Sequence, residues 1–274
     1  MLAPMTRIAV IGGGRIGEAL VSGLLAARHP VKDLVVGERA EERARELADR
    51  YGVRVTDTVD AVDGAHVIVV AVKPADVEAT VAQISQADLD GSTEQLLVSL
   101  AAGIPTSFYE KRLPAGFPVV RVMPNTPMLV GEGMSVLAPG RHVQSGQLDL
   151  IEGILSSVGR VATVPESQID AVTAVSGSGP AYVFLVAEAM IDAAVALGLG
   201  RPVARELVVQ TLCGSAAMLG EGDSATELRA AVTSPGGTTA AALRELEAGG
   251  LRTAFYDAVD AAARRSAELG GKAE

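Results

Sequence analysis

A change of pattern near residue 163 most constrains what this chain can fold into. Before it, short β-branched runs alternate with helical patterns; after it, the strand signals stop and long Ala-rich helical segments follow. Strands that alternate with helices predict a parallel, doubly wound sheet. The expected strands are "RIAVI", "DLVVG", "VRV", "HVIVVAV", "QLLVSL", "PVVRVM", "MSVLA" and "GRVATV".

We therefore expect an α/β protein with a sheet domain at residues 1–163 and an all-α domain at residues 164–274. The helices of the second domain are expected near 178–199, 201–220, 224–231, 237–247 and 251–269. Their wide apolar faces would be exposed in an isolated domain of this size. This predicts self-association through the helical domain.

The net charge and the cysteine content limit the classes of partner and the cellular compartment that we expect. The formal net charge is −10, which argues against nucleic acid or an anionic membrane surface as a partner. Cys213 is the single cysteine, which is typical of a reducing compartment, and we expect a cytoplasmic protein. Charged residues interrupt both the N-terminal apolar run and the run at 180–199, so neither is predicted to span a membrane.

The stretch "IGGGRIG" lies between the first predicted strand and the first predicted helix. Gly12, Gly14 and Gly17 fit the pattern G-x-G-x-x-G, which is weak evidence alone but stronger between a strand and a helix. Backbone N–H groups of such a loop and the following helix start can bind a pyrophosphate. We therefore predict a Rossmann-like dinucleotide-binding domain; the alternative is a merely tight turn.

The end of the second predicted strand bears on the choice of cofactor. Glu38 there favours a free ribose 2′-hydroxyl, as in NAD, whereas the adjacent Arg39 can accept the 2′-phosphate of NADP. The alternative for Arg39 is a surface position at the start of the next helix. The sequence leaves the choice between the two cofactors open.

Three further segments end strands at the same predicted sheet edge. Lys73 and Pro74 follow the fourth strand, "SLAAG" ends the fifth and "MPNTP" the sixth. Ligands bind at the carboxyl edge of doubly wound sheets, and small residues there would let a flat nicotinamide ring lie against backbone. A solvated loop lysine is the alternative for Lys73.

The helical domain lacks the usual proton donors of a carbonyl reductase. Residues 143–271 contain neither Lys nor His. A protonated imine already carries its proton, so this absence favours reduction of C=N over C=O. Tyr182 and Tyr256 are possible donors, although packing roles are the stronger interpretation for both.

Two glycine-rich turns in this domain are predicted to begin helices: "SGSGPAY" and "TSPGGTT". The backbone donors of a helix start can bind a carboxylate as well as a phosphate, so the second turn could hold a small amino acid. The alternative is an ordinary turn between helices that is capped by Ser234.

With these residues in view, the chain resembles the pyrroline-5-carboxylate reductase family from Arg7 to about Leu269. The resemblance rests on "IGGGRIG", "AVKP", "SLAAGI", "MPNTP", "SGSGPAY" and especially "VTSPGGTTAAALRELEAGG". It implies a Rossmann domain, an interleaved helical dimerisation domain, and a dimer or a decamer of dimers. No metal is implied.

Site residues follow from the resemblance position by position. Thr239 would be catalytic, hydrogen-bonding the ring nitrogen of the substrate, and Glu166 would lie on the substrate side. The substrate carboxylate would be bound by Ser234, Gly237 and Thr238. The cofactor would contact Ile11, Gly12, Gly13, Gly14, Arg15, Ile16, Arg39, Thr58, Val72, Lys73, Pro74, Leu100, Ala101 and Ala102.

The resemblance implies reduction of 1-pyrroline-5-carboxylate to L-proline with NADPH, NADH being possible. Two departures from the family pattern bear on the cofactor: Thr58 stands where relatives often have Asn, and Glu38 precedes Arg39. A β-hydroxyacid dehydrogenase is one rival, but that class relies on a lysine in the helical domain. A non-catalytic nucleotide sensor is the other, and it leaves the second glycine turn unexplained.

Overall fold

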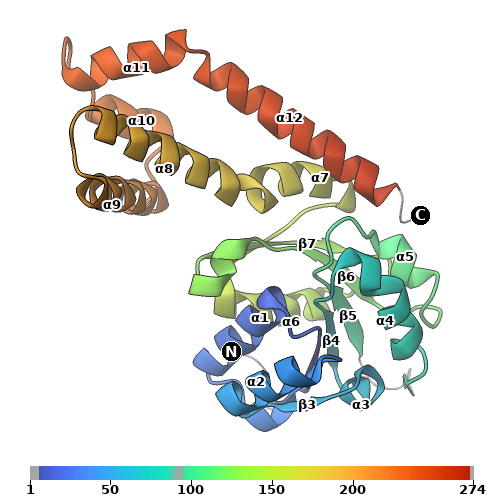
Figure 1. The fold of residues 1–274 in the computed structure, drawn as a ribbon. Coiled ribbons are helices and arrows are strands. Elements are labelled where there is room, and N and C mark those ends of the chain that lie inside the picture. Colours follow the sequence, from blue (N-terminus) through green and yellow to red (C-terminus); the bar gives the residue numbers. More distant parts are fainter. Residues whose placement is uncertain (1–5, 88, 90–94, 272–274) are drawn as a thin grey trace. The chain divides into compact units, whose positions relative to one another are not determined.

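A computed structural model describes residues 6–87, 89 and 95–271 of the chain (Figure 1). Its contacts divide the chain into two compact units: Met1–Ser178 together with Ala262–Glu274, and Gly179–Ala261. The first unit contains the predicted sheet, and the second is helical. The units differ from the division at 163/164 because helical residues up to Ser178 and from Ala262 group with the sheet.

All the expected strands form, in one sheet ordered β3-β2-β1-β4-β5-β6-β7-β8 within the described residues. Its pairs are parallel except β6 with β7, which are antiparallel. The expectation of a purely parallel sheet was therefore wrong at this pair, because the connection over 124–132 is too short for a crossover. The strands are β1 (Ile8–Ile11), β2 (Leu34–Gly37), β3 (Arg54–Thr56), β4 (Val67–Val70), β5 (Leu96–Ser99), β6 (Val119–Met123), β7 (Gly133–Pro139) and β8 (Gly159–Thr163).

Helices cover both faces of the sheet, as a doubly wound fold requires (Figure 1). Side chains alternate along β1, so that Ile8 and Val10 pack on one face and Ala9 and Ile11 on the other. The first face is covered by α1 (Arg15–Ala26), α2 (Glu41–Tyr51) and α6 (Ser145–Leu155), and the second by α3 (Thr58–Val62), α4 (Val77–Ile84) and α5 (Thr106–Glu110).

The five helices expected beyond β8 form within three residues of their expected bounds, and a further short helix precedes them. Along the described chain they are α7 (Ile169–Val172), α8 (Gly179–Ala196), α9 (Arg201–Gly220), α10 (Ala225–Ala231), α11 (Thr238–Ala248) and α12 (Leu251–Gly270). The last turns of α12 belong to the sheet unit, where Ser266 Oγ donates to Asp170 Oδ1 at 2.6 Å.

One expected turn is helical instead. Helix α8 begins at Gly179 within "SGSGPAY", as expected, but the residues before it are not an open turn, because Thr173–Gly177 form a π-helical turn between α7 and α8. Pro180 has no N–H to donate to the carbonyl of Ser176, four residues before it. The side-chain Nδ2 of Asn125 donates to that carbonyl instead, at 3.2 Å. The backbone of this segment is therefore engaged in helix geometry rather than held open for a ligand.

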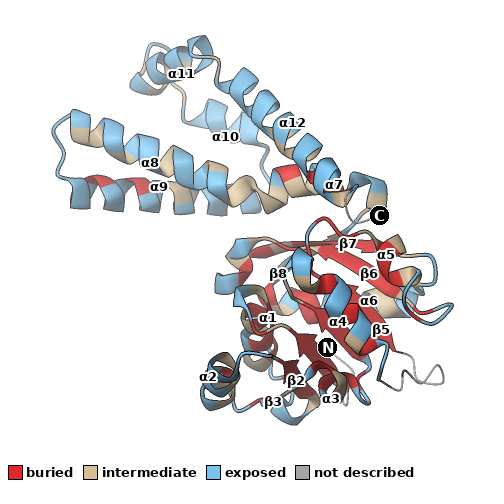
Figure 2. Ribbon diagram, turned by 45° about the vertical axis from the view of Figure 1, so that its right-hand side comes forward, coloured by how far each residue is buried: buried red, intermediate tan, exposed pale blue. Residues whose placement is uncertain are grey.

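The helical unit has almost no interior of its own. Within Gly179–Ala261, all of which is described, only Ala204 and Val208 are buried. Figure 2 shows α8 to α11 largely in the colour of exposed residues. Large apolar side chains on α8 are exposed, among them Phe184 and Leu185 at 66% each. A unit with so little buried surface needs a partner surface to cover its apolar faces.

Candidate functional site

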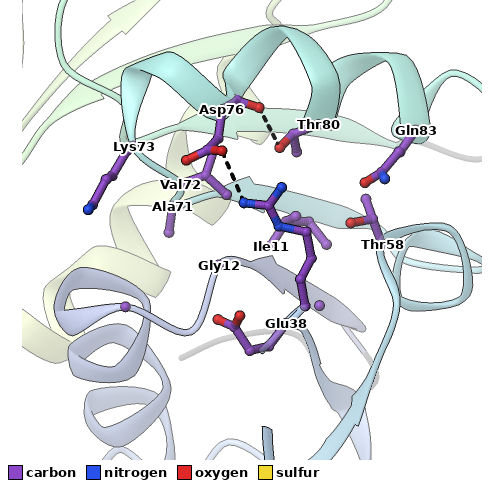
Figure 3. Close-up of a pocket in the computed structure, with 13 residues that line it drawn as sticks. Ile11, Gly12, Glu38, Thr58, Ala71, Val72, Lys73, Asp76, Thr80 and Gln83 are labelled. Atoms are coloured by element: carbon purple, nitrogen blue, oxygen red, sulfur yellow. Dashed lines mark hydrogen bonds and ion pairs between the residues drawn. The ribbon is translucent and has the colours of Figure 1, made fainter. Parts of the chain in front are cut away.

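A cavity of about 270 Å³ lies at the carboxyl edge of the sheet (Figure 3). Strand β1 pairs with both β2 and β4, so the strand order reverses there, and ligands of doubly wound folds bind at such a point. The cavity is lined by Ile11, Gly12, Gly14, Gly37, Glu38, Arg39, Thr58, Ala71, Val72, Lys73, Asp76, Thr80 and Gln83.

The glycines of the first loop are required by close packing. Gly12 has φ +108°, and a Cβ there would lie 2.8 Å from the carbonyl oxygen of Ala71. A Cβ on Gly17 would overlap the carbonyl oxygen of Gly12. At Gly14, by contrast, a Cβ would meet no atom within 4 Å. The first and third glycines thus fit the turn and the helix packing, while the second keeps open space for a ligand.

Helix α1 begins with its N-terminal donors uncapped. Gly14 is the N-cap residue in extended conformation, and no side chain caps the helix. The first N–H groups of a helix have no partner within it, and they favour an anion. The open space at Gly14 adjoins these donors, so the residues fit the pyrophosphate of a dinucleotide.

Hydrogen bonds from neighbouring strands hold this loop in place. Gly12 N–H donates to the carbonyl of Gly37 at 2.8 Å, and Gly13 N–H donates to Glu38 Oε2 at 2.9 Å. Arg43 Nε donates to the carbonyl of Gly13 at 2.8 Å. The loop conformation is therefore fixed by β2 and α2 before any ligand binds.

Glu18 on α1 anchors the arginine that holds the loop. Its carboxylate accepts hydrogen bonds from Arg43, from Arg50 at 3.0 Å and from Tyr51 at 2.8 Å. Burial acts to raise the pKa of Glu18, but the hydrogen bonds from Arg43 and Tyr51 outweigh it, and the pKa is lowered. This carboxylate is thus ionised and structural.

Two side chains follow β2 at the far end of the cavity, and their roles differ. The Glu38 carboxylate accepts from backbone N–H groups of Gly13 and Ala40, each at 2.9 Å. Arg39 Nη2 donates to Asp76 Oδ1 at 3.0 Å. Thr58 is buried where α3 begins and lines the same cavity.

The predicted cofactor residues divide into two groups of seven. Those that line the cavity are Ile11, Gly12, Gly14, Arg39, Thr58, Val72 and Lys73; those that do not are Gly13, Arg15, Ile16, Pro74, Leu100, Ala101 and Ala102. In the second group, Gly13 gives its N–H to Glu38, and Leu100 and Ala101 are buried just beyond β5. All fourteen assignments to the cofactor stay predictions.

Five lining residues were missed from sequence, and three of them, Asp76, Thr80 and Gln83, lie at the start of α4 and along it. They are spaced by four and three residues, which places their side chains along one face of a helix. This spacing, directly after "AVKP", could have identified them, because Lys73 and Pro74 are predicted to lie at the ligand-binding edge of the sheet. Gly37 and Ala71 were missed because small strand-end residues carry no pattern of their own.

Glu166 is held within the sheet unit. Its carboxylate accepts hydrogen bonds from the N–H of Thr106 at 2.9 Å and from the Thr106 hydroxyl. Arg121, which is buried, lies 3.3 Å from it. The side chain thus joins Thr106 at the start of α5 to Arg121 in the middle of β6, which are 15 residues apart in sequence.

The second glycine turn begins α11 in the helical unit. Gly237 N–H donates to the carbonyl of Ser234 at 3.0 Å, and Gly236 has φ +69°. With Pro235 in the second position, this is the pattern of a type II turn. Gly237 is the N-cap residue and no side chain caps the helix, so the alternative of capping by Ser234 was wrong. The first donors of α11, with Thr238 and Thr239, are left available for an anion.

The two tyrosines of the helical unit differ. Tyr182 packs edge-to-face on Phe255, with ring centroids 6.5 Å apart. Tyr256 is 79% exposed. The aromatic contact supports a packing role for Tyr182. No group of three or more His, Cys, Asp or Glu side chains that could hold a metal occurs among the described residues.

Both parts of the chain match known families. A family model described as pyrroline-5-carboxylate reductase dimerisation matches residues 166–269. A second, described as NADP oxidoreductase coenzyme F420-dependent, matches residues 7–103. The first match covers the exposed helices and the second covers the glycine loop.

Individual proteins are similar over nearly the whole chain. The pyrroline-5-carboxylate reductase of Mycobacterium tuberculosis is 55% identical, over 98% of this chain and 98% of that protein. A solved pyrroline-5-carboxylate reductase from Coxiella burnetii has 39% identity and a TM-score of 0.92, covering 97% of this chain and 98% of that one. The Plasmodium falciparum pyrroline carboxylate reductase, solved with NADP bound, has 30% identity and a TM-score of 0.84, covering 97% and 99%.

One helical stretch, Glu166–Ala196, is long and apolar enough to cross a membrane by length and composition, with a mean hydropathy of 1.5. One such helix is weak evidence for a membrane span. The same residues lie within the dimerisation match, which offers another reason for their apolar exposed surface. The expectation that the chain has no membrane partner stays a prediction.

Proposed function

The chain belongs to the pyrroline-5-carboxylate reductase family, and we propose that it reduces the imine of 1-pyrroline-5-carboxylate to L-proline, the last step of proline biosynthesis. The observation that carries this is 55% identity to a curated reductase over 98% of both chains, which includes both glycine turns. When bound, the reduced nicotinamide supplies the hydride that the imine carbon accepts. The chain's own residues bind and orient the two reactants.

We propose that the cavity in the sheet unit holds the dinucleotide, NADPH in preference and NADH as the alternative. The pyrophosphate would lie at Gly14, where the uncapped start of α1 offers its N–H groups. Arg39 and Thr58 would meet the adenosine end, and Lys73 the nicotinamide half. The NADP-bound relative from Plasmodium falciparum supports this cofactor.

The substrate carboxylate is proposed to bind the turn before α11. Backbone N–H groups there, with Ser234, Gly237 and Thr238, would bind the carboxylate, because the helix start has no capping side chain of its own. The Thr239 hydroxyl would hydrogen-bond the ring nitrogen and so fix the imine carbon relative to the nicotinamide. Since a protonated imine brings its own proton, the lack of Lys and His between 143 and 271 is compatible with this chemistry.

The proposed substrate-side role of Glu166 acts through Thr106. The carboxylate is already shared between Thr106 and Arg121, so we propose that it positions the start of α5 rather than transferring a proton. This segment follows Leu100, Ala101 and Ala102, the residues proposed to surround the nicotinamide.

We propose that residues 1–163 form a dinucleotide-binding domain and that residues 164–274 form the substrate-binding and dimerisation domain. The dimerisation match and the exposed apolar faces of α8 and α9 support self-association. A dimer is the minimum assembly, and a decamer of dimers is the larger one proposed. The proposed setting is the cytoplasm, without nucleic acid or membrane as a partner.

Steady-state oxidation of NADPH and of NADH with 1-pyrroline-5-carboxylate tests the function. We expect turnover with at least one cofactor and none with β-hydroxy acids in the reverse direction. Oxidation of β-hydroxy acids would instead support the rival function of a β-hydroxyacid dehydrogenase. A folded chain that binds NADPH but turns over no cyclic imine would support the nucleotide sensor and overturn the proposal.

A further inference from the structure

The adenosine end of the cavity contains two carboxylates and one guanidinium. Glu38 reaches the cavity from the end of β2, while Asp76 reaches it from the start of α4. A dashed line in Figure 3 marks the ion pair of Asp76 with a guanidinium. The partner of Asp76 in that pair is Arg39, the cation predicted to meet a 2′-phosphate. The charges around the cation therefore bear on the choice of cofactor.

The Glu38 carboxylate is hydrogen-bonded to the backbone. Both of its oxygens accept hydrogen bonds, one from Gly13 N–H and one from Ala40 N–H. Hydrogen bonds from backbone donors hold a carboxylate in one orientation. Glu38 therefore supports the loop whichever cofactor binds, and it does not contact Arg39 among the described hydrogen bonds.

The Asp76 carboxylate, by contrast, accepts no hydrogen bond from the backbone of α4. Asp76 is the N-cap residue of α4, a position where an aspartate side chain usually accepts a hydrogen bond from the helix backbone. Here its side chain makes no capping hydrogen bond. The carboxylate turns to Arg39 instead, with 3.0 Å between Oδ1 and Nη2. Its charge thus serves the cavity rather than the helix.

From this geometry, and given the dinucleotide site of the proposed function, we infer that Asp76 is a specificity-determining residue that lowers the preference for a 2′-phosphate. It does so by occupying the guanidinium of Arg39 and by placing a negative charge beside the phosphate position. A 2′-hydroxyl has no such conflict. Both side chains are partly exposed, at 70% for Arg39 and 37% for Asp76, so the effect is moderate.

The test compares two probes that differ only in the 2′-phosphate: adenosine 2′,5′-bisphosphate and adenosine 5′-monophosphate. Calorimetric titration gives their dissociation constants for the wild type and for Asp76→Asn, which keeps a neutral acceptor for Arg39. We expect the bisphosphate to bind about two- to fivefold more tightly to the variant. Binding of the monophosphate should stay unchanged.

Glu41→Gln is the matched control. It also removes one carboxylate that is paired with an arginine, Arg45 at 2.9 Å, but it does not line the cavity. We expect no change in the ratio of the two dissociation constants. An equal change in Glu41→Gln would mean that net charge alone acts, and it would overturn the assignment to Asp76.

Arg39→Ala tests the route through the guanidinium. In that background Asp76→Asn should have a smaller effect on the bisphosphate than in the wild type. An unaltered ratio in Asp76→Asn overturns the inference, as does equal weakening of both probes. Because the probes need no imine, a shifted ratio in a chain without imine turnover would keep this inference and refute the proposed reaction. Failure of both probes to bind the wild type would refute both.

Discussion

Two helix starts in this molecule, those of α1 and α11, can both bind an anion through backbone N–H groups, but different hydrogen bonds hold the two in place. Each has a glycine N-cap in extended conformation, Gly14 and Gly237, and neither has a capping side chain. Each therefore presents unpaired N–H groups to an anion. The proposed ligands are the cofactor pyrophosphate at the first and the substrate carboxylate at the second.

The hydrogen bonds that hold the loop before α1 and the turn before α11 come from different parts of the chain. The loop before α1 is bonded to residues distant in sequence: Gly37, Glu38 and Arg43. The turn before α11 is closed by a local bond from Gly237 to Ser234. In the loop before α1, Gly12 and Gly17 are required because neighbouring backbone atoms leave no room for a Cβ. In the turn before α11, Gly236 has open space around it but is required because its φ is +69°.

This difference shows that one anion-binding device can be built in two ways. The first loop is fixed by the sheet, so changes in it should affect folding and cofactor binding together. The second turn is fixed by its own four residues, so changes in it should affect catalysis with little effect on folding. The following variants test that division, from the largest expected effect to the smallest.

Gly17→Ala should have the largest effect. Its Cβ would overlap the carbonyl oxygen of Gly12, and neither backbone segment can move without disturbing α1 or β1. We expect the free energy of unfolding to fall by about 3 kcal/mol and NADPH binding to be lost. Denaturant unfolding and fluorescence titration with NADPH measure the two effects.

Gly14→Ala is the control for that variant. No atom lies within 4 Å of its Cβ, so we expect only the cost of placing alanine at an N-cap, about 0.7 kcal/mol. Its methyl group would still enter the space proposed for the pyrophosphate and weaken NADPH binding. If Gly14→Ala destabilised the fold as much as Gly17→Ala, the division of roles between these glycines would be wrong.

Thr239→Ala should lower turnover without lowering stability. The hydroxyl is proposed to hold the ring nitrogen of the imine, and loss of one such donor costs about 100-fold in kcat/KM. Thr239 is the second residue of α11 and only partly buried, so unfolding should be unchanged. Steady-state kinetics with 1-pyrroline-5-carboxylate and denaturant unfolding measure these quantities.

Thr211→Ala is the matched control, because its hydroxyl donates to the carbonyl of Leu207 at 2.7 Å within α9. It should leave kcat/KM unchanged. An unchanged kcat/KM in Thr239→Ala as well would remove Thr239 from the mechanism.

Gly236→Ala isolates the backbone requirement of the second turn. Alanine at φ +69° costs about 1 kcal/mol, and no atom lies within 4 Å of the new Cβ. We expect a loss of stability of that size and a modest rise in KM for the imine. Gly146→Ala in α6, also without neighbours, should be neutral or slightly stabilising. A Gly236→Ala variant as unstable as Gly17→Ala would refute the contrast between the two turns.

Most of the fold could be predicted from the sequence because the strands and helices have strong local patterns. The runs around Ile8–Ile11 and Val67–Val70 are β-branched and buried on both faces, and α9 and α12 are long enough to leave little choice. The glycine loop was also predictable, since its spacing between a strand and a helix has a steric reason.

Features that depend on distant partners could not be predicted. Arg39 and Asp76 are 37 residues apart, and nothing in one sequence pairs them. The hydrogen bond from Asn125 to Ser176 compensates for Pro180, but it joins residues 51 apart. The antiparallel pairing of β7 is different, because the connection over 124–132 is by itself too short for a parallel crossover.

Glu18→Gln tests whether the support of the first loop depends on pH. The pKa of Glu18 is lowered from its ordinary value of 4.5 despite burial, because Arg43 and Tyr51 bond to the charged form. A lowered pKa in the folded state means that the stabilisation is complete above the unfolded value and is lost as pH falls through the folded one. Wild-type stability should therefore fall below about pH 4.5 more steeply than that of the variant, whose stability at neutral pH should be lower by about 1 kcal/mol. Parallel acid profiles from denaturant unfolding would show that the Arg43 contact to Gly13 holds the loop without the charge of Glu18.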